Sequence, residues 1–136
     1  ALEQFLRVPD RDRAEAARAH LALGRARALR GEFDRAEASF QQTTELSNGP
    51  LAAEAQYRIG EARRQAGQLQ AAADAFVKLP ILYAHEEWVR KGLLAAGLVY
   101  EQLQQPDKAK RFFAELVDKY PDSAEAKAAK DRLRNG

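Results

Sequence analysis

The sequence predicts an all-α protein built of antiparallel helical hairpins that repeat along the chain. The first observation is a series of phenylalanines, Phe5, Phe40, Phe76 and Phe113, separated by 35, 36 and 37 residues. The second is the composition, because alanine, the best helix former and a poor strand former, supplies 28 of the 136 residues. A fixed period of this length is typical of stacked supersecondary units. We therefore expect about eight helices in a single domain over residues 1–136.

Each full repeat carries the same landmark residues. A glycine precedes an alanine by 12 residues, and the phenylalanine follows that alanine four residues later. Alanine and phenylalanine at i and i+4 lie on one face of a helix, so each pair marks a packing face. A second glycine follows the first after seven residues in two copies, as Gly31 and Gly67, and Gln104 stands there in the third. The landmark triplets are Gly24, Ala36 and Phe40; Gly60, Ala72 and Phe76; and Gly97, Ala109 and Phe113.

The first four helices are delimited by caps, a proline and the landmark phenylalanines. Phe5 and Phe40 each lie within a helix, because their alanine partners stand four residues before them. Asp12 and Glu15 have the spacing of an N-cap pair that opens a helix. Pro50 suits the first position of a helix, where its missing N–H is not needed. These features predict helices over 1–7, 12–30, 33–47 and 50–66.

The last four helices follow from the same signals. Pro80 is expected to end a helix, and Pro106 stands where the next second helix begins. Asp122 and Glu125 form another N-cap pair, which opens the closing helix. These features predict helices over 69–79, 85–104, 106–119 and 123–134.

At these landmarks the sequence resembles the tetratricopeptide repeat (TPR) family, over nearly the whole chain. The resemblance implies a right-handed α-solenoid of helix–turn–helix units of about 34 residues. The large aromatic residue expected three residues after the first glycine is present only as Tyr100, whereas Arg27 and Arg63 replace it elsewhere. We expect those arginine stems to lie over apolar surface in less dense units. The implied divisions are a second helix of a preceding unit at 1–10, units at 17–50, 53–86 and 90–123, and a capping helix at 123–136.

The resemblance also implies where a partner binds. First helices line the concave side of such a stack, and in the family their groove-facing positions contact a peptide or protein ligand. Those positions form a strip with spacing 3, 4, 3 beside each landmark glycine. Leu21, Tyr57, Leu94 and Leu98 are expected to be exposed there, which favours binding of a segment with apolar anchors and acidic residues near unit one. The candidate groove residues are Arg18, Leu21, Arg25, Glu54, Tyr57, Glu61, Arg64, Lys91, Leu94, Leu98 and Glu101.

Two further features refine this expectation. One subset of the family grips carboxyl-terminal peptides with a lysine/asparagine clamp, but Leu21 and Arg25 stand at clamp-type positions and the strip holds no asparagine. The clamp is therefore disfavoured.

The connection from Lys78 to Trp88 is unusually apolar. Its large side chains are expected to seal the joint between units two and three, with an exposed anchor patch as the alternative; they are Ile81, Leu82, Tyr83 and Trp88.

The sequence offers no pattern for catalysis or for a cofactor. It has no cysteine, and its two histidines, His20 and His85, stand 65 residues apart, so neither a zinc site nor a nucleophile–base pair is indicated. No run of 18 apolar residues predicts a membrane span. With 22 basic and 20 acidic residues, nucleic-acid binding through the arginines of the first unit is the weaker alternative. We expect a non-catalytic module without a small-molecule substrate.

The last unit adds an expectation about location. The stretch from Tyr120 to Ala129, with its "YPDS" start, is similar to bacterial envelope proteins such as Tol-Pal accessory proteins and outer-membrane assembly lipoproteins. That likeness implies a periplasmic or envelope-associated scaffold, with a cytoplasmic location as the alternative. Because no methionine occurs, the chain is interpreted as an excerpt or a processed product. The alternative to partner binding is an architectural spacer or a self-associating segment of a longer repeat array, since both ends look like half-units.

Overall fold

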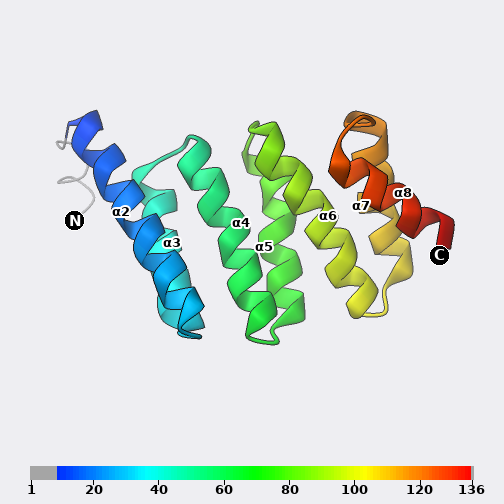
Figure 1. Ribbon diagram of the computed structural model, residues 1–136, viewed down its shortest axis with the longest axis horizontal. Coiled ribbons are helices and arrows are strands. Elements are labelled where there is room, and N and C mark those ends of the chain that lie inside the picture. The colour runs from blue at the N-terminus through cyan, green and yellow to red at the C-terminus, as the bar shows by residue number, and fades with distance from the viewer. Residues whose placement is uncertain (1–8, 136) are drawn as a thin grey trace.

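The helices of the computed structural model form a row of antiparallel hairpins in two layers, with the first helix of each hairpin in one layer and the second helix in the other (Figure 1). The structure describes residues 9–135, so the helix expected over 1–7, with Ala1 and Phe5, lies outside the described residues. Each helix packs on the next one in sequence, and α2 and α4, α4 and α6, and α6 and α8 also touch. The predicted all-α class is confirmed. The described helices are α2 (Asp10–Leu29), α3 (Phe33–Leu46), α4 (Pro50–Gln65), α5 (Leu69–Leu82), α6 (Glu86–Gln102), α7 (Pro106–Lys119) and α8 (Ala124–Asn135).

The landmark glycines let the two helices of each hairpin approach closely. Phe76 on α5 is fully buried, and its ring lies directly over Gly60 of α4. A Cβ built on Gly60 would lie under 3.0 Å from carbons of that ring, closer than real Cβ atoms come. The expected burial of the phenylalanines between helices is therefore confirmed where the structure describes them. The same relationship joins Gly24 to Phe40 and Gly97 to Phe113.

Each hairpin turn closes with the same backbone arrangement. The second residue after the first helix has a positive φ in all three turns, namely 78° at Gly31, 82° at Gly67 and 60° at Gln104. The residue after it donates its N–H to the carbonyl oxygen five residues earlier, as from Glu32 to Arg27 at 2.9 Å. This is the Schellman pattern, which satisfies carbonyls at a helix end. Glycine adopts it freely, whereas Gln104 brings a Cβ into the left-handed region.

Arginine replaces the expected aromatic residue in two hairpins and bonds to the backbone there. Arg27 donates from Nη1 to the carbonyl oxygen of Arg35 at 3.3 Å, and Arg63 donates from Nη1 to that of Ala71 at 3.1 Å. Each acceptor lies eight residues after its arginine, at the start of the second helix. The guanidinium groups thus join the two helices of a hairpin, a contact that the sequence does not reveal.

Arg63 also joins its hairpin to the preceding one. Its Nε and Nη2 donate to the two carboxylate oxygens of Glu37 on α3, at 2.8 and 3.1 Å. The hydrogen bond to Glu37 raises the pKa of the Arg63 guanidinium above its ordinary value. In the third hairpin Tyr100 takes the equivalent position and stacks on Phe112, with ring centroids 5.6 Å apart. This position therefore joins the two helices of its hairpin in each case, through a hydrogen bond from arginine or through the stacked ring of tyrosine.

Two predicted helix ends are wrong, namely the start of α2 and the end of α5. α2 already begins at Asp10, so Asp12 and Glu15 lie inside the helix and do not cap it. α5 continues through Pro80 to Leu82 instead of ending before the proline. Pro80 lacks the N–H that would bond to the Phe76 carbonyl, so this turn loses one helical hydrogen bond, but the N–H of Tyr83 still donates to the Leu79 carbonyl at 3.1 Å.

The closing helix is capped one residue later than predicted. The Oγ of Ser123 accepts the N–H of Ala126 at 3.0 Å, which makes Ser123 the N-cap residue of α8 in place of Asp122. Glu125 does not complete a capping pair, because its carboxylate accepts a hydrogen bond from Arg90 Nε at 3.1 Å. This contact ties α8 to α6.

The apolar joint between α5 and α6 is sealed by only half of the predicted side chains. Tyr83 and Trp88 pack against the main core, and burial raises the pKa of the Tyr83 hydroxyl. Ile81 and Leu82, in contrast, are 72% and 61% exposed, so their predicted role in the seal is wrong. Both lie in the last turn of α5, which projects beyond the core.

Candidate functional site

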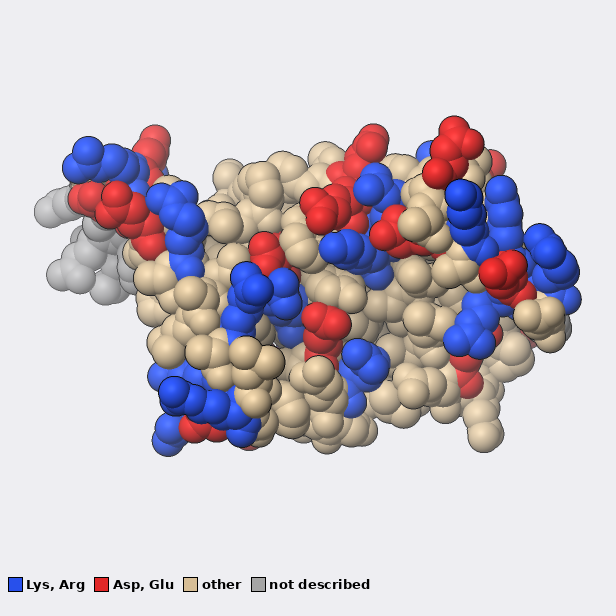
Figure 2. Space-filling view, viewed as in Figure 1, with Lys and Arg blue, Asp and Glu red and all other residues tan. Residues whose placement is uncertain are grey.

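The predicted groove residues lie on α2, α4 and α6, which with α8 form one face of the row, here called the first-helix face. Figure 2 shows acidic and basic side chains interspersed over its middle, with basic side chains gathered where α2 ends. Exposure differs along the strip. Arg18, Arg25 and Arg64 are exposed; Glu54, Tyr57, Glu61, Lys91, Leu94, Leu98 and Glu101 are half-buried; and Leu21 is buried.

Leu21 does not belong to the accessible surface, and its predicted exposure is wrong. Only 6% of it is exposed, and it belongs to a core cluster with Phe40 and Ile59. The cause is the direct contact between α2 and α4, which places α4 over this side of α2. A partner at this face would meet Arg18 and Arg25 instead.

Tyr57 lies at the centre of the face and is held in place by aromatic contacts. Its ring centroid is 5.4 Å from that of Phe76 and 5.7 Å from that of Trp88. Its hydroxyl donates to Glu61 Oε2 at 3.4 Å. Burial, and next the charge of Glu61, raise the pKa of Tyr57 to about 12. The hydroxyl is therefore a protonated donor at neutral pH.

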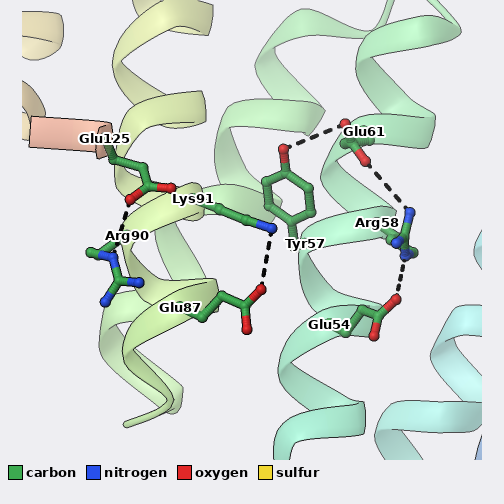
Figure 3. A network of polar contacts seen from close by, with 8 residues as sticks. All are labelled: Glu54, Tyr57, Arg58, Glu61, Glu87, Arg90, Lys91 and Glu125. Carbon is green, nitrogen blue, oxygen red and sulfur yellow. Dashed lines mark hydrogen bonds and ion pairs between the residues drawn. The ribbon is translucent and has the colours of Figure 1, made fainter. Parts of the chain in front are cut away.

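A charged network runs along α4 beside Tyr57 (Figure 3). Arg58 binds Glu54 at 2.7 Å and lies 3.9 Å from Glu61, while Arg64 lies 3.9 Å from the other oxygen of Glu61. Arg58 was not among the predicted groove residues, because it directly follows Tyr57 and so falls outside the 3, 4, 3 spacing. The glutamate four residues before it was the available signal, since such pairs meet on a helix surface.

The corresponding part of α6 carries a lysine that lies over an aromatic ring. The Nζ of Lys91 is 4.6 Å from the centre of the Trp88 indole and 3.4 Å from Glu87 Oε1. Figure 3 shows the Lys91 side chain pointing from α6 toward Tyr57 on α4. Leu94 and Leu98 pack against the main core with part of their surface exposed. Between α4 and α6 the side chains next to the core are thus aromatic, and those that reach toward the surface are charged.

Two hollows open between the first helices. The larger, with a volume of about 530 Å³, lies between α4, α6 and α8 and is called the α4–α8 pocket. The smaller, of about 210 Å³, lies between α2 and α4 and is called the α2–α4 pocket. Of the eleven predicted groove residues, five line neither hollow, namely Arg18, Leu21, Glu54, Lys91 and Leu94. Six line one of them, namely Tyr57, Arg64, Leu98 and Glu101 in the larger and Arg25 and Glu61 in the smaller.

The α4–α8 pocket contains residues that the strip did not include. Ala95, Gln102 and Arg132 line it beside the predicted residues. The Nε of Arg132, on α8, lies 3.5 Å from Glu101 Oε1 on α6. In each unit the strip includes the residue that directly follows the landmark glycine. Leu133 stands in the place of that glycine in α8, so the same spacing would have selected Arg134. Arg132 is therefore a feature of tertiary packing that repeat spacing alone does not locate.

Neither a metal centre nor a membrane-spanning helix is found in the described part of the chain. Among the described residues, no three side chains of the histidine, cysteine, aspartate or glutamate types gather in a way that would hold a metal ion. No helix there combines the length and hydropathy that crossing a bilayer requires.

Comparisons with known proteins agree with the repeat architecture. The tetratricopeptide repeat domain of Arabidopsis OM64 has a TM-score of 0.70 at 20% identity, covering 90% of this chain and 98% of that one. A TPR-like protein of Chlorobium tepidum has a TM-score of 0.65 at 15% identity, covering 93% and 97%. MamA has a TM-score of 0.63 at 23% identity, covering 86% and 68%. At these identities the likeness concerns the fold alone, and no curated protein matches the sequence.

Sequence models identify the family directly. One tetratricopeptide repeat model matches residues 1–48 and 21–85, and a second matches residues 92–123. Repeats of this kind are typically non-catalytic modules for protein–protein interaction. Together the matched segments include every landmark glycine and phenylalanine on which the hairpins pack. The chain belongs to the tetratricopeptide repeat family.

Proposed function

We propose that this chain is a non-catalytic interaction module that binds a segment of a partner protein along its first-helix face. The observation that carries the proposal is the pair of hollows between successive first helices, each with an arginine at its rim and apolar surface inside. Concave sites with a few convergent polar groups are the usual form of binding sites. The two pockets share α4 as a common wall, so one bound segment can reach both.

The α2–α4 pocket favours an acidic residue beside an apolar one. Arg25 is exposed and, like Arg18, forms no ion pair within residues 9–135. Leu29 lines the same pocket and is 90% exposed, so its side chain is accessible to an apolar residue of a partner. A partner carboxylate would pair with Arg25 while an apolar side chain covers Leu29.

The charge pattern supports a protein partner over nucleic acid. A nucleic-acid surface is a continuous basic patch that follows the phosphates. Here Glu54 and Glu61 lie in the middle of the face and hold Arg58 between them, so its charge is already neutralised. The formal net charge of the chain is only +2.

The experiment is partner capture with charge-reversed variants. We expect Arg25→Glu and Glu61→Arg each to reduce recovery of crosslinked partner, while far-ultraviolet circular dichroism shows unchanged helicity. Arg111→Glu, an exposed reversal on the second helix α7, is the matched control and should recover the partner normally. Equal recovery with all three variants would place the binding surface elsewhere.

The likeness of the last unit to bacterial envelope proteins adds a location to the proposal. The stretch that carries the likeness, from Tyr120 to Ala129, starts with "YPDS"; Ser123 of that motif caps α8, and Ala126 and Ala129 pack in the core. We propose an envelope-associated scaffold on this likeness. Fractionation of the native host, followed by immunoblotting for this chain, tests the location. Recovery in the cytoplasmic fraction alone would contradict it.

A further inference from the structure

The closing helix α8 supplies one wall of the α4–α8 pocket on the first-helix face. Arg132 of α8 and Arg64 of α4 both line the α4–α8 pocket, on opposite sides of α6. The contact of α8 with α6 is fixed away from the pocket by Arg90, which binds Glu125 at 3.1 Å. Arg132 also pairs with Glu101 of α6 at 3.5 Å, so this cation belongs to the lining of the pocket while it joins α8 to α6.

The two guanidinium groups remain available to a bound anion. Arg64 lies 3.9 Å from Glu61 and Arg132 lies 3.5 Å from Glu101, and their side chains are 42% and 54% exposed. A guanidinium carries five N–H donors, so one distant carboxylate leaves most of them free. Glu101 is the single acidic residue of the lining, against two arginines. The balance of charge in the pocket therefore favours a carboxylate.

The inner surface of the same pocket favours an aliphatic side chain. Tyr57, Ala95 and Leu98 present partly exposed apolar surface to it, and Tyr57 is held by its contacts with Trp88 and with Phe76, which is fully buried beneath this surface. This surface is rigid because it rests on the main core. A volume of about 530 Å³ is large enough for a leucine or isoleucine side chain together with the backbone on either side of it.

We propose that the α4–α8 pocket takes an aliphatic residue of the partner whose neighbours are aspartate or glutamate, and that Arg132 and Arg64 bind those side-chain carboxylates. This rests on the proposed function and names the chemistry of the segment. The carboxylates in this proposal are those of side chains within an internal segment, which also crosses α4 to reach Arg25 in the α2–α4 pocket. The helix α8 is thereby part of the binding site.

The test is selection from a library of random peptides displayed on phage, with the immobilised whole chain as bait. Wild-type protein should enrich peptides with leucine, isoleucine or valine flanked by aspartate or glutamate at internal positions. Arg132→Gln should lose this enrichment. Arg134→Gln removes the same charge from an exposed position of the same helix and should retain it. Circular dichroism of the variants establishes that α8 still forms.

Affinity measurements then test the assignment of Arg132 directly. The most enriched peptide, amidated at its C-terminus, should bind Arg132→Gln about tenfold more weakly than wild type, the value expected for one charged hydrogen bond. Arg134→Gln should match wild type. Emission of Trp88, the single tryptophan, reports binding because its ring contacts Tyr57 at the pocket.

The outcomes separate this inference from the function on which it rests. Enrichment of peptides without the acidic–aliphatic pattern, or equal affinity for Arg132→Gln, would overturn the inference and leave peptide binding intact. A dependence on a free terminal carboxylate would also overturn it. Failure to enrich any peptide above an unrelated helical protein would overturn both.

Discussion

The ring of Phe76 lies so close to Gly60 that no side chain fits between the two helices of the second hairpin. Phe76 is 0% exposed, and Tyr57 packs against it from the first-helix face at a centroid distance of 5.4 Å. The ring is therefore confined from both sides. The same close approach that stabilises the hairpin also supports the inner surface of the α4–α8 pocket, which Phe76 lines.

Gly60→Ala should destabilise the protein. Alanine would gain about 1 kcal/mol in helix propensity, but its Cβ would lie under 3.0 Å from the Phe76 ring. Forcing the helices apart should outweigh that gain, for a net loss of about 1–3 kcal/mol in urea unfolding. Gly49→Ala is the control without a clash, because its Cβ would meet only Ser47 Oγ, at 3.9 Å, and its cost should be limited to the preference for glycine over alanine at the N-cap of α4. A Gly60→Ala variant as stable as wild type would contradict the close approach.

Phe76→Ala should show how much a landmark phenylalanine contributes to the free energy of unfolding. Removal of a fully buried ring leaves a cavity, so we expect a loss of about 3–5 kcal/mol in the free energy of unfolding. Phe33→Ala removes a half-buried ring that belongs to neither core cluster and should cost clearly less. A loss below about 1 kcal/mol for Phe76→Ala would contradict its place in the core.

The fold was predictable because its determinants are local and repeated. The contact of Gly60 with Phe76 joins residues within one hairpin, and it recurs at a fixed spacing that the sequence displays. Individual helix ends were less predictable. Asp12 and Ser123 are both acceptable N-caps by composition, and only the backbone decides that Ser123 caps a helix while Asp12 lies inside one.

The candidate site was predictable only in part, because it depends on contacts between hairpins. The helical period places Leu21 and Tyr57 on equivalent faces, but the position of α4 buries Leu21 and leaves Tyr57 half-exposed. Arg132 reaches the pocket from α8, a helix whose packing angle no spacing rule encodes. Whether these residues bind a partner stays a prediction.

Gln104→Gly should stabilise the third hairpin turn. Gln104 has a φ of 60°, and glycine occupies the equivalent position in the other two turns. A residue with a Cβ is strained there, whereas glycine is not, although glycine also gains entropy in the unfolded chain. The expected net gain is about 0.5–1 kcal/mol in thermal or urea unfolding. Gln102→Gly, inside the last turn of α6, should lower stability because glycine is a poor helix former; a gain there equal to that of Gln104→Gly would refute the strain.

The ion pair between Glu37 and Arg63 should couple two hairpins measurably. The pair has two hydrogen bonds, at 2.8 and 3.1 Å, and both side chains are only 22–25% exposed. A double-mutant cycle with Glu37→Gln and Arg63→Gln should give a coupling energy of about 1 kcal/mol. The exposed pair of Glu32 and Arg35, with one contact at 3.5 Å, is the control and should couple near zero. Equal coupling of both pairs would show that Arg63 contributes no link between hairpins.

Stability should fall at alkaline pH through Tyr57. Its pKa is raised from 10.0 to about 12 by burial, so above pH 10 the unfolded chain releases a proton that the folded chain keeps. The contribution of this group to stability is complete below about pH 10 and is lost as the pH rises toward about 12. Wild type should therefore lose more unfolding free energy over this window than Tyr57→Phe, which has no proton to release. Other groups titrate in the same range, but they are common to both proteins and cancel in the comparison. Parallel loss of stability in the two proteins would mean that Tyr57 is as accessible to solvent in the folded state as in the unfolded one.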